Sequence, residues 1–307
     1  MREAFVEALL KQNEIDRRFC FLTGDLGFAM LEPLRDALGE RFINAGIAEQ
    51  NMMSVAAGLC KSGLNVWVYS ISPFCYARPL EQVRNDICFH GLPVKIIGSG
   101  GGFGYGLAGP THHALEDCGV MSSLLGMSVY APCFASDMAT VVEEMSASKG
   151  PTYLRLARGA SLNNHTEYPF LTFRKLCRGT EGLVVALGSM GVRMLSMLGG
   201  MSEKVRPSLW VCSRLPIVGE ALPQCLVEEI LHSEWLMVIE DHVRNGGLGS
   251  QLALALLERS VPVKRYVHKF AKGYLSGLYG SEDFHLAENG LSAEALADSI
   301  RDLMQCS

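Results

Sequence analysis

Three short segments of the sequence combine side chains that could do chemistry. The first, residues 46–52 (GIAEQNM), places Glu49 directly after a predicted strand and at the start of an amphipathic helix. The partial positive charge of a helix N-terminus stabilises a carboxylate by about 0.3–1 kcal/mol, which would make Glu49 a capping residue. A carboxylate at the carboxyl end of a strand can also exchange a proton with a ligand, so both roles stay open.

The second segment is a glycine-rich loop, residues 98–112 (GSGGGFGYGLAGPTH). Glycine at this density allows positive φ angles or the close approach of a ligand to the backbone. Gly104, Gly106 and Gly109 match the G-x-G-x-x-G pattern of dinucleotide-binding loops. No acidic residue ends the next predicted strand, where a ribose partner would belong, so the match is weak.

Two histidines end this loop, and we expect Thr111 to cap a helix that carries them. His113 and Asp117 are four residues apart and could share a helix face as metal ligands. A third ligand at a fitting spacing is absent. We therefore expect His112 and His113 to be solvated polar residues of a helix turn rather than metal ligands.

The third segment, residues 72–78 (SPFCYAR), places Phe74, Tyr76 and Arg78 between a predicted strand and a helix. Aromatic residues at such a position are usually part of the core. An acid, two aromatic rings and a histidine on three neighbouring loops nevertheless favour a ligand site. A similar segment, residues 240–251 (EDHVRNGGLGSQ), follows a later strand, and no P-loop, H-E-x-x-H or G-x-S-x-G motif is present.

The elements that must position these segments alternate between strand and helix. In the first half we expect strands at 19–23, 42–45, 64–69, 94–98, 128–131 and 152–156, and helices at 3–11, 49–61, 80–89, 114–125 and 137–148. In the second half we expect strands at 183–187, 208–212, 235–239 and 261–266, and helices at 190–201, 222–231, 247–259 and 293–304. Such alternation predicts an α/β protein with mainly parallel sheets that are flanked by helices.

Residues 157–180 interrupt the alternation. They contain asparagines, a proline and several charges without periodicity, which is typical of a connecting segment. We therefore expect two domains, residues 1–160 and 181–307, with a linker over residues 161–180. Residues 268–291 form the least regular part of the second domain.

Composition excludes several classes of protein. The 307 residues are 49% hydrophobic and 19% charged, which excludes a long disordered chain. The net charge of −5 is spread over the chain, so a nucleic acid is not an expected partner. No apolar run is long enough to cross a membrane. The ten cysteines include no C-x-x-C pair, which indicates reduced thiols and a cytoplasmic protein.

Several stretches, in this order, resemble one family of enzymes: GIAEQNMMSVAAGL, YSISPFCYARPLEQV, GPTHHALED, GPTYLRLARG and VIEDHVRNGGLGSQ. The sequence is similar to the carboxyl-terminal two-thirds of transketolases and 1-deoxyxylulose-5-phosphate synthases, and to the beta subunit of 2-oxo acid dehydrogenases. The resemblance implies that the first domain binds the pyrimidine ring of thiamine diphosphate and that the second is a transketolase C-terminal domain.

The resemblance also implies roles for single residues. Glu49 would be the glutamate that hydrogen-bonds a pyrimidine nitrogen and assists removal of the thiazolium C2 proton. Phe74, or Tyr76 if the register differs by two residues, would stack on the pyrimidine. His112 would face the substrate, and Arg2 would reach a substrate phosphate.

Three more residues are candidates for the site. Asp25 lies in the only near match to the family's G-D-G sequence and would be a cofactor residue. Arg78 and His113 would be substrate residues beside Arg2 and His112.

The domain that binds the diphosphate in this family does not match any part of the chain. We therefore expect a separate N-terminal subunit that holds the diphosphate and a Mg²⁺ or Ca²⁺ ion, in an α2β2 heterotetramer. The chain has Gly100, Ala108 and Phe134 where transketolases have a histidine, an aspartate and an arginine. The expected reaction is transfer of a two-carbon ketol unit between a ketose and an aldose, with an unusual donor or acceptor.

Other functions remain open at this point. The resemblance also fits a 2-oxo acid decarboxylating subunit or a 1-deoxyxylulose-5-phosphate synthase-like enzyme. Outside thiamine chemistry, the alternatives are a nicotinamide-dependent dehydrogenase, which the missing ribose acid disfavours, and a non-catalytic subunit, which the presence of Glu49 and His112 disfavours.

Overall fold

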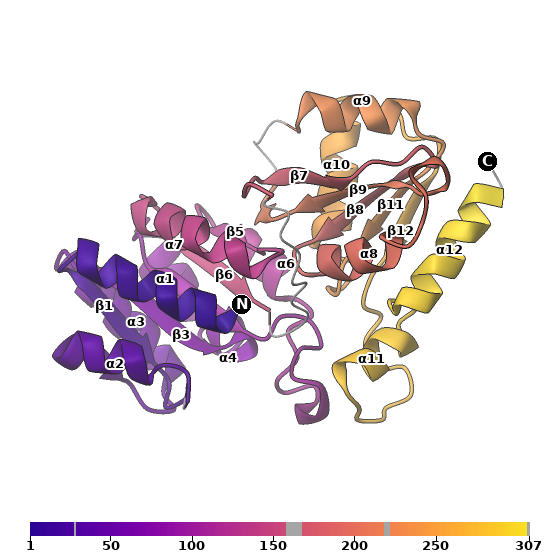
Figure 1. Ribbon diagram of the computed structural model, residues 1–307. Helices are drawn as coiled ribbons and strands as arrows, with labels where there is room; N and C mark the ends of the chain where they lie inside the picture. Colours follow the sequence, from indigo (N-terminus) through magenta and orange to yellow (C-terminus); the bar gives the residue numbers. More distant parts are fainter. Residues whose placement is uncertain (28, 158–167, 218–221, 306–307) are drawn as a thin grey trace.

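The chain folds into two α/β units that lie side by side (Figure 1). The computed structural model describes residues 1–27, 29–157, 168–217 and 222–305. Each unit contains one sheet with helices on its faces, as the alternating sequence pattern predicts. Among the described residues, no helix is both long enough and apolar enough to span a bilayer.

The first sheet has seven strands in the order β10-β5-β6-β4-β3-β1-β2. All neighbours in it are parallel except β10, which is antiparallel to β5. The strands are β1 (Phe19–Thr23), β2 (Phe42–Asn44), β3 (Asn65–Ile71), β4 (Lys95–Ser99), β5 (Ser128–Tyr130), β6 (Thr152–Leu156) and β10 (Arg214–Leu215). Every residue of β1, β4 and β6 is buried, because helices cover both faces of the sheet.

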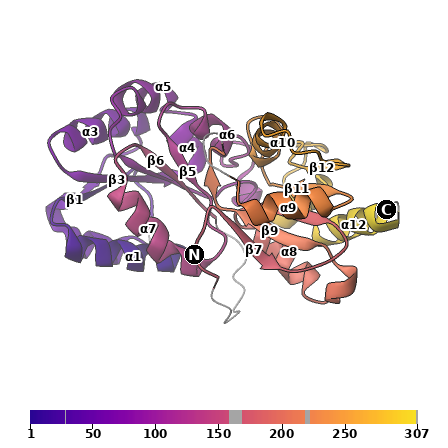
Figure 2. The same cartoon turned by 90° about the horizontal axis from the view of Figure 1, so that it is seen from above.

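Helices α1 and α7 pack on one face of this sheet, and α3, α4 and α5 lie on the other (Figure 2). The helices of this unit are α1 (Arg2–Ile15), α2 (Glu32–Leu38), α3 (Glu49–Lys61), α4 (Ser72–Tyr76), α5 (Leu80–Gln82), α6 (Asp117–Ser122) and α7 (Met138–Ala147). A short π-helix, Val83–Cys88, continues α5. Short 3₁₀ turns occur at Gly39–Arg41, Gly106–Ala108 and Ala135–Asp137.

The second sheet has five strands in the order β12-β11-β8-β9-β7. They are β7 (Phe173–Cys177), β8 (Leu183–Leu187), β9 (Ser208–Cys212), β11 (Leu236–Ile239) and β12 (Tyr266–Lys269), and only β7 runs antiparallel. Its helices are α8 (Met190–Leu198), α9 (Gln224–His232), α10 (Leu248–Glu258), α11 (Glu282–Glu288) and α12 (Ala293–Gln305), with a 3₁₀ turn at Glu203–Val205.

The structure differs from the expected elements at several places. Strand β7 lies inside the expected linker, residues 161–180, of which residues 161–167 fall outside the described part. Its sequence, FRKLC, mixes charges with apolar residues: Arg174 is buried in an ion pair with Asp137, and Lys175 pairs with Glu229. The strand expected at 261–266 was predicted too early in the sequence, since β12 begins only at Tyr266. Helices α2 and α11 were not predicted.

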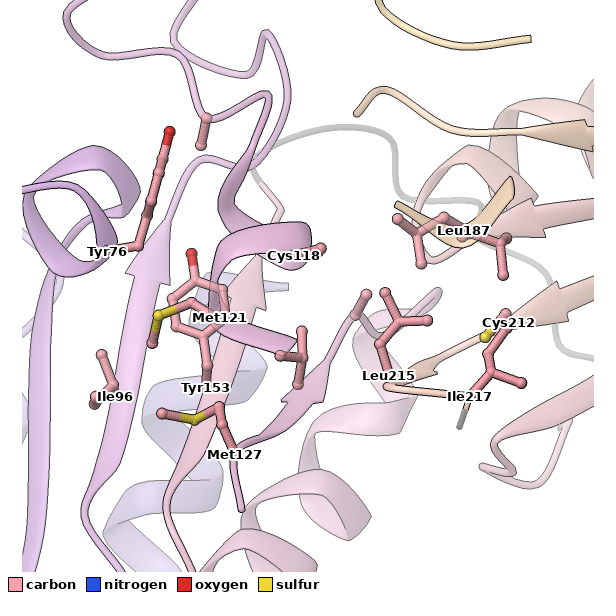
Figure 3. Packing of buried hydrophobic residues seen from close by; sticks show 14 of the residues in the cluster. Tyr76, Ile96, Cys118, Met121, Met127, Tyr153, Leu187, Cys212, Leu215 and Ile217 are labelled. Atoms are coloured by element: carbon pink, nitrogen blue, oxygen red, sulfur yellow. The ribbon is translucent and has the colours of Figure 1, made fainter. Parts of the chain in front are cut away.

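A shared core joins the two units. Strand β10 follows β9 of the second sheet in sequence but pairs with β5 of the first sheet. Leu215 and Ile217 therefore fill the space between Met127 of the first unit and Leu187 of the second, within one continuous hydrophobic cluster (Figure 3). Burial of this apolar surface from both sides fixes the relative position of the two sheets.

Candidate active site

The three segments singled out in the sequence follow strands of the first sheet. Glu49 begins α3 shortly after β2, α4 follows β3, and the glycine-rich loop follows β4. Because these strands are parallel, their carboxyl ends lie along one edge of the sheet, and the three segments meet there.

Glu49 is the buried acid of this edge. Its side chain is 2% exposed, and its Oε2 accepts a hydrogen bond of 2.6 Å from Nη1 of Arg78. The N-terminus of α3 and this guanidinium together stabilise the carboxylate. Gly24 allows the chain to pass close by, since a Cβ there would lie 3.5 Å from Oε1 of Glu49. Within the described part of the chain, no hydrogen bond reaches Oε1.

Phe74 lies next to this ion pair. The guanidinium carbon of Arg78 is 4.1 Å from the centre of the Phe74 ring, and the edge of the His112 ring meets Phe74 at 5.4 Å between centroids. Tyr76, the alternative stacking residue, points into the core and donates a hydrogen bond of 2.9 Å to Glu116. Burial and the neighbouring carboxylates raise the pKa of Tyr76. Phe74, and not Tyr76, therefore contacts the arginine that pairs with Glu49.

His112 and Arg2 extend the row of side chains. The ring of His112 lies 5.9 Å from that of Tyr105, and its Nδ1 is 2.9 Å from Oγ1 of Thr111. Nη2 of Arg2 donates to Oγ of Ser99 at 3.1 Å and to the hydroxyl of Tyr105 at 3.5 Å. The side chains Glu49, Arg78, Phe74, His112, Tyr105 and Arg2 thus form one continuous row.

Sequence reasoning missed Tyr105 and Ser99. The ring of Tyr105 occupies the space beside Gly100, where an added Cβ would lie 2.2 Å from Cε2 of the tyrosine. Gly100 has a φ of +82°, which a residue with a side chain rarely adopts. The one sequence signal for Tyr105 was its position inside the glycine-rich loop, where it is the one residue with a polar ring before the histidines.

His113 lies away from this row. It is 3% exposed, its Nε2 donates to the carbonyl of Gly106 at 2.8 Å, and its Nδ1 accepts from the hydroxyl of Tyr274 at 3.0 Å. Burial lowers the pKa of His113, which keeps it neutral in this bonding pattern. The expected helix over 114–125 begins only at Asp117, so both histidines lie in a turn, and His113 faces the second unit.

Asp25 is exposed and lies at the ends of β1 and β2. It has a φ of +53°, and it exchanges two hydrogen bonds of 2.9 and 3.0 Å with Asn44. Together with Thr23 and Gly27 it lines a cavity of about 230 Å³. The described residues contain no group of three or more His, Cys, Asp or Glu side chains that could hold a metal ion.

Asp241 of the second unit and residues of the first unit together hold the glycine-rich loop at its base. Arg155 is buried between Asp117, at 3.4 Å, and Asp241, at 3.0 Å. Gly102 and Ala114 exchange backbone hydrogen bonds of 2.9 Å that close the loop. Gly102, with a φ of +59°, allows close contact, since a Cβ there would lie 1.9 Å from Oδ2 of Asp241.

The acidic pair at 240–241 is thus structural. Glu240 accepts hydrogen bonds of 2.7 and 2.8 Å from the backbone N–H groups of Leu248 and Gly249, at the start of α10. It also bonds His268 at 2.7 Å. Residues 240–251 resemble the three site segments in sequence because all of them lead from a strand to the N-terminus of a helix.

Comparisons with known proteins identify the family of the chain. The family described as "Transketolase, pyrimidine binding domain" matches residues 1–162. One of the subunits of the apulose-4-phosphate transketolase of Phocaeicola vulgatus is 31% identical over 273 residues, which cover 86% of this chain and 85% of that protein. "6-deoxy-6-sulfo-D-fructose transketolase subunit SqwH" of a Clostridium species is 27% identical over 308 residues, which cover 99% of this chain and 94% of that protein.

Solved structures support the same assignment. One that is described as "Split gene transketolase, inactive beta4 tetramer" superposes with a TM-score of 0.83 at 28% identity, covering 99% of this chain and 97% of that chain. The transketolase from Leishmania mexicana superposes with a TM-score of 0.75 at 16% identity over 45% of its length, which shows the shared fold. The family predicted from the sequence is therefore confirmed. The chain belongs to the transketolase family of thiamine-diphosphate-dependent enzymes, in which it corresponds to the C-terminal subunit of split transketolases.

Proposed function

We propose that Glu49 and Phe74 hold the pyrimidine ring of thiamine diphosphate and that His112 and Arg2 act on the substrate. The observation that carries this proposal is the row itself: at the carboxyl edge of a parallel sheet, Arg78 joins a buried carboxylate to an aromatic face, and that face contacts a histidine. When bound, the cofactor supplies the nucleophilic carbon and the electron sink for breaking and forming a carbon–carbon bond.

The residues present fit this cofactor. Oε1 of Glu49 receives no hydrogen bond within the described residues, so it is open to a protonated ring nitrogen. Phe74 offers a half-buried aromatic face, and stacking on such a face contributes about 0.5–1.5 kcal/mol beyond the burial of area. Asp25 would lie behind this pair, at the mouth of the cavity that it lines.

His112 would donate or accept a proton at a substrate oxygen. Its ring is in contact with Phe74 on one side and with Tyr105 on the other, so two aromatic neighbours fix its orientation. A positioned histidine typically contributes a factor of about 10² to 10⁴ in rate.

Arg2 would bind an anionic group at the far end of the substrate. Two relatives are named for a phosphorylated and a sulfonated sugar, and a guanidinium binds either group with charge-assisted hydrogen bonds. We therefore propose a phosphorylated or sulfonated sugar as substrate. Phe134 plays no part in this, since its ring stacks on Tyr168 at 5.6 Å.

A second subunit would complete the enzyme. We propose that it binds the diphosphate and a Mg²⁺ or Ca²⁺ ion and that two copies of each chain form a heterotetramer in the cytoplasm. A similar chain is described as an inactive β4 tetramer, which supports a need for a second kind of subunit. None of the nine cysteines among the described residues forms a disulfide, which is compatible with a reducing compartment.

Reconstitution tests this function. The chain is mixed with a diphosphate-binding transketolase subunit, and ketol transfer is measured with thiamine diphosphate and Mg²⁺. We expect activity only in the mixture, and we expect His112→Asn to lower kcat by about 10²-fold while the complex still assembles. Turnover by the chain alone would contradict the proposed second subunit, and full activity of His112→Asn would contradict the proposed site.

A further inference from the structure

Arg78 contacts both of the side chains that are assigned above to the pyrimidine ring, Glu49 and Phe74. Its guanidinium donates a hydrogen bond of 2.6 Å to Glu49, and the same group lies over the Phe74 ring at 4.1 Å. A guanidinium is planar, delocalised and rich in N–H donors, and it stacks well on aromatic faces. These are also the properties of a protonated aminopyrimidine ring.

We propose that Arg78 takes the place of the pyrimidine ring in the cofactor-free chain and leaves this place when the cofactor binds. The proposal rests on the function proposed above for Glu49 and Phe74. It assigns Arg78 to the cofactor site as a competing internal group, and not to the substrate.

Burial of Glu49 explains why the chain needs such a group. The carboxylate is 2% exposed, and a buried carboxylate without a partner is strongly destabilising. In the absence of a ligand, the Arg78 side chain supplies the opposite charge. A ligand that donates a hydrogen bond to Glu49 would make the guanidinium dispensable.

The surroundings of Arg78 allow it to leave. Its side chain is 42% exposed, whereas Glu49 is buried, so the arginine end of the pair faces solvent. A long side chain at the surface loses little when it turns outward, because water solvates the guanidinium again. Arg155, the other arginine paired with acids near this edge, is 6% exposed and has no such freedom.

Competition lowers the apparent affinity for the cofactor. A ligand that must displace Arg78 binds to the fraction of molecules in which the arginine points away, and its apparent Kd rises in proportion. Removing Arg78 should therefore tighten binding of the pyrimidine ring, although it removes a positive charge and a buried contact.

The test uses the full chain and the isolated pyrimidine half of thiamine, 4-amino-5-hydroxymethyl-2-methylpyrimidine, as the probe. We expect Arg78→Ala to lower the Kd for this probe by about tenfold in calorimetric titration. Arg84→Ala, which removes an exposed arginine from the following π-helix, is the matched control and should leave the Kd unchanged. Weaker, equal or undetectable binding by Arg78→Ala, relative to the unmodified chain, would overturn the proposal.

A chemical rescue gives a second readout that does not depend on the cofactor. Arg78→Ala should melt about 5 °C lower, since Glu49 then lacks its partner. Methylguanidinium chloride should raise the melting temperature of Arg78→Ala more than sodium chloride does at equal ionic strength. It should also raise the Kd of this variant for the probe. It should have no such effect on the double variant Arg78→Ala/Glu49→Gln. Equal effects of the two salts on Arg78→Ala would overturn the proposal.

Glu49→Gln separates this proposal from the function on which it rests. We expect this variant to bind the probe at least tenfold more weakly, because its amide replaces the carboxylate that holds the ring. If Glu49→Gln binds the probe as well as the unmodified chain does, the assigned pyrimidine site is wrong. If Glu49→Gln weakens binding and Arg78→Ala does not tighten it, only the role given to Arg78 is wrong.

Discussion

Arg155 of β6 and Asp241, the second residue after β11, form an ion pair of 3.0 Å between the two units of the chain. The pair is buried, and Asp117 contributes a second carboxylate to the same guanidinium. The glycine-rich loop lies directly against this group through Gly101 and Gly102. The second unit therefore contacts the loop that carries Tyr105 and His112, although it supplies no residue to the row of site residues.

Arg155→Met should destabilise the protein strongly. The substitution leaves two buried carboxylates without a cationic partner, and breaking such a pair costs about 3–5 kcal/mol. Chemical denaturation measures the free energy of unfolding. Arg301→Ala, which breaks the exposed pair with Asp298, is the control and should cost less than about 1 kcal/mol. Equal losses for the two variants would show that burial of the Arg155 group has no energetic role.

Gly102→Ala should displace the glycine-rich loop and lower ketol transfer. A Cβ at this position would meet Asp241 at 1.9 Å, and the buried ion pair prevents Asp241 from moving aside. Gly91→Ala is a close control, because Gly91 has the same φ of +59° and nothing lies within 4 Å of the added Cβ. Both variants carry the backbone cost of about 1–2 kcal/mol of an alanine at positive φ. A larger loss of ketol transfer in Gly102→Ala than in Gly91→Ala therefore reports the contact with Asp241.

Stability should fall as the pH is lowered from 7.5 to 5.5. Burial lowers the pKa of His113 below its ordinary value of 6.5, so the unfolded chain binds more protons than the folded chain in this window. The groups that face His113 are Tyr274, His285 and, more distantly, His112. One additional proton corresponds to a slope of at most about 1.4 kcal/mol per pH unit.

His113→Gln checks this assignment. Urea denaturation at several pH values between 5.5 and 7.5 gives the slope for the unmodified chain and for the variant. The variant should have the smaller slope, because a glutamine binds no proton in either state. A slope that does not change would place the acid sensitivity on another group.

Arg2→Gln should raise the KM for phosphorylated or sulfonated sugars about 10- to 100-fold in the reconstituted enzyme, with a smaller effect on kcat. This is the effect expected for one lost charge-assisted hydrogen bond, about 1.5–3 kcal/mol. The KM for a neutral sugar of the same length should change little. As the control, Arg17→Gln, which removes an exposed arginine after α1, should behave like the unmodified chain. Equal increases in KM for charged and neutral sugars would contradict a role of Arg2 in binding an anion.

Local sequence patterns predicted most of the fold. Helix α3 has the bounds expected from its apolar stripe, and β1, β6, β8 and β9 lie where apolar runs between turn residues placed them. Strand β7 escaped prediction because its two charged residues interrupt the apolar run, although Arg174 is buried in an ion pair with Asp137. Strand β12 escaped because its residues are only partly buried. Periodicity reports burial, so elements that are half exposed are poorly predicted by it.

Contacts between distant residues could not be predicted in the same way. The sequence singled out Glu49 and Arg78, but the bond between them joins residues 29 positions apart, and spacing alone does not show it. Tyr105 occupies the space beside Gly100 only because the loop closes through Gly102 and Ala114. Similarly, the sequence does not distinguish His112 from its neighbour His113. The turn directs His112 to the site and His113 to the second unit.

Exchange of the thiazolium C2 proton of thiamine diphosphate in the reconstituted enzyme tests the central role given to Glu49 most directly. Quenched-flow mixing in D₂O followed by proton NMR measures its rate, with Glu81→Gln, which changes an exposed carboxylate on α5, as the control. We expect Glu49→Gln to slow exchange about 10²-fold or more while Glu81→Gln leaves it unchanged. An unchanged rate in Glu49→Gln would show that Glu49 has only a structural role at the start of α3, where it pairs with Arg78, and it would contradict the proposed site.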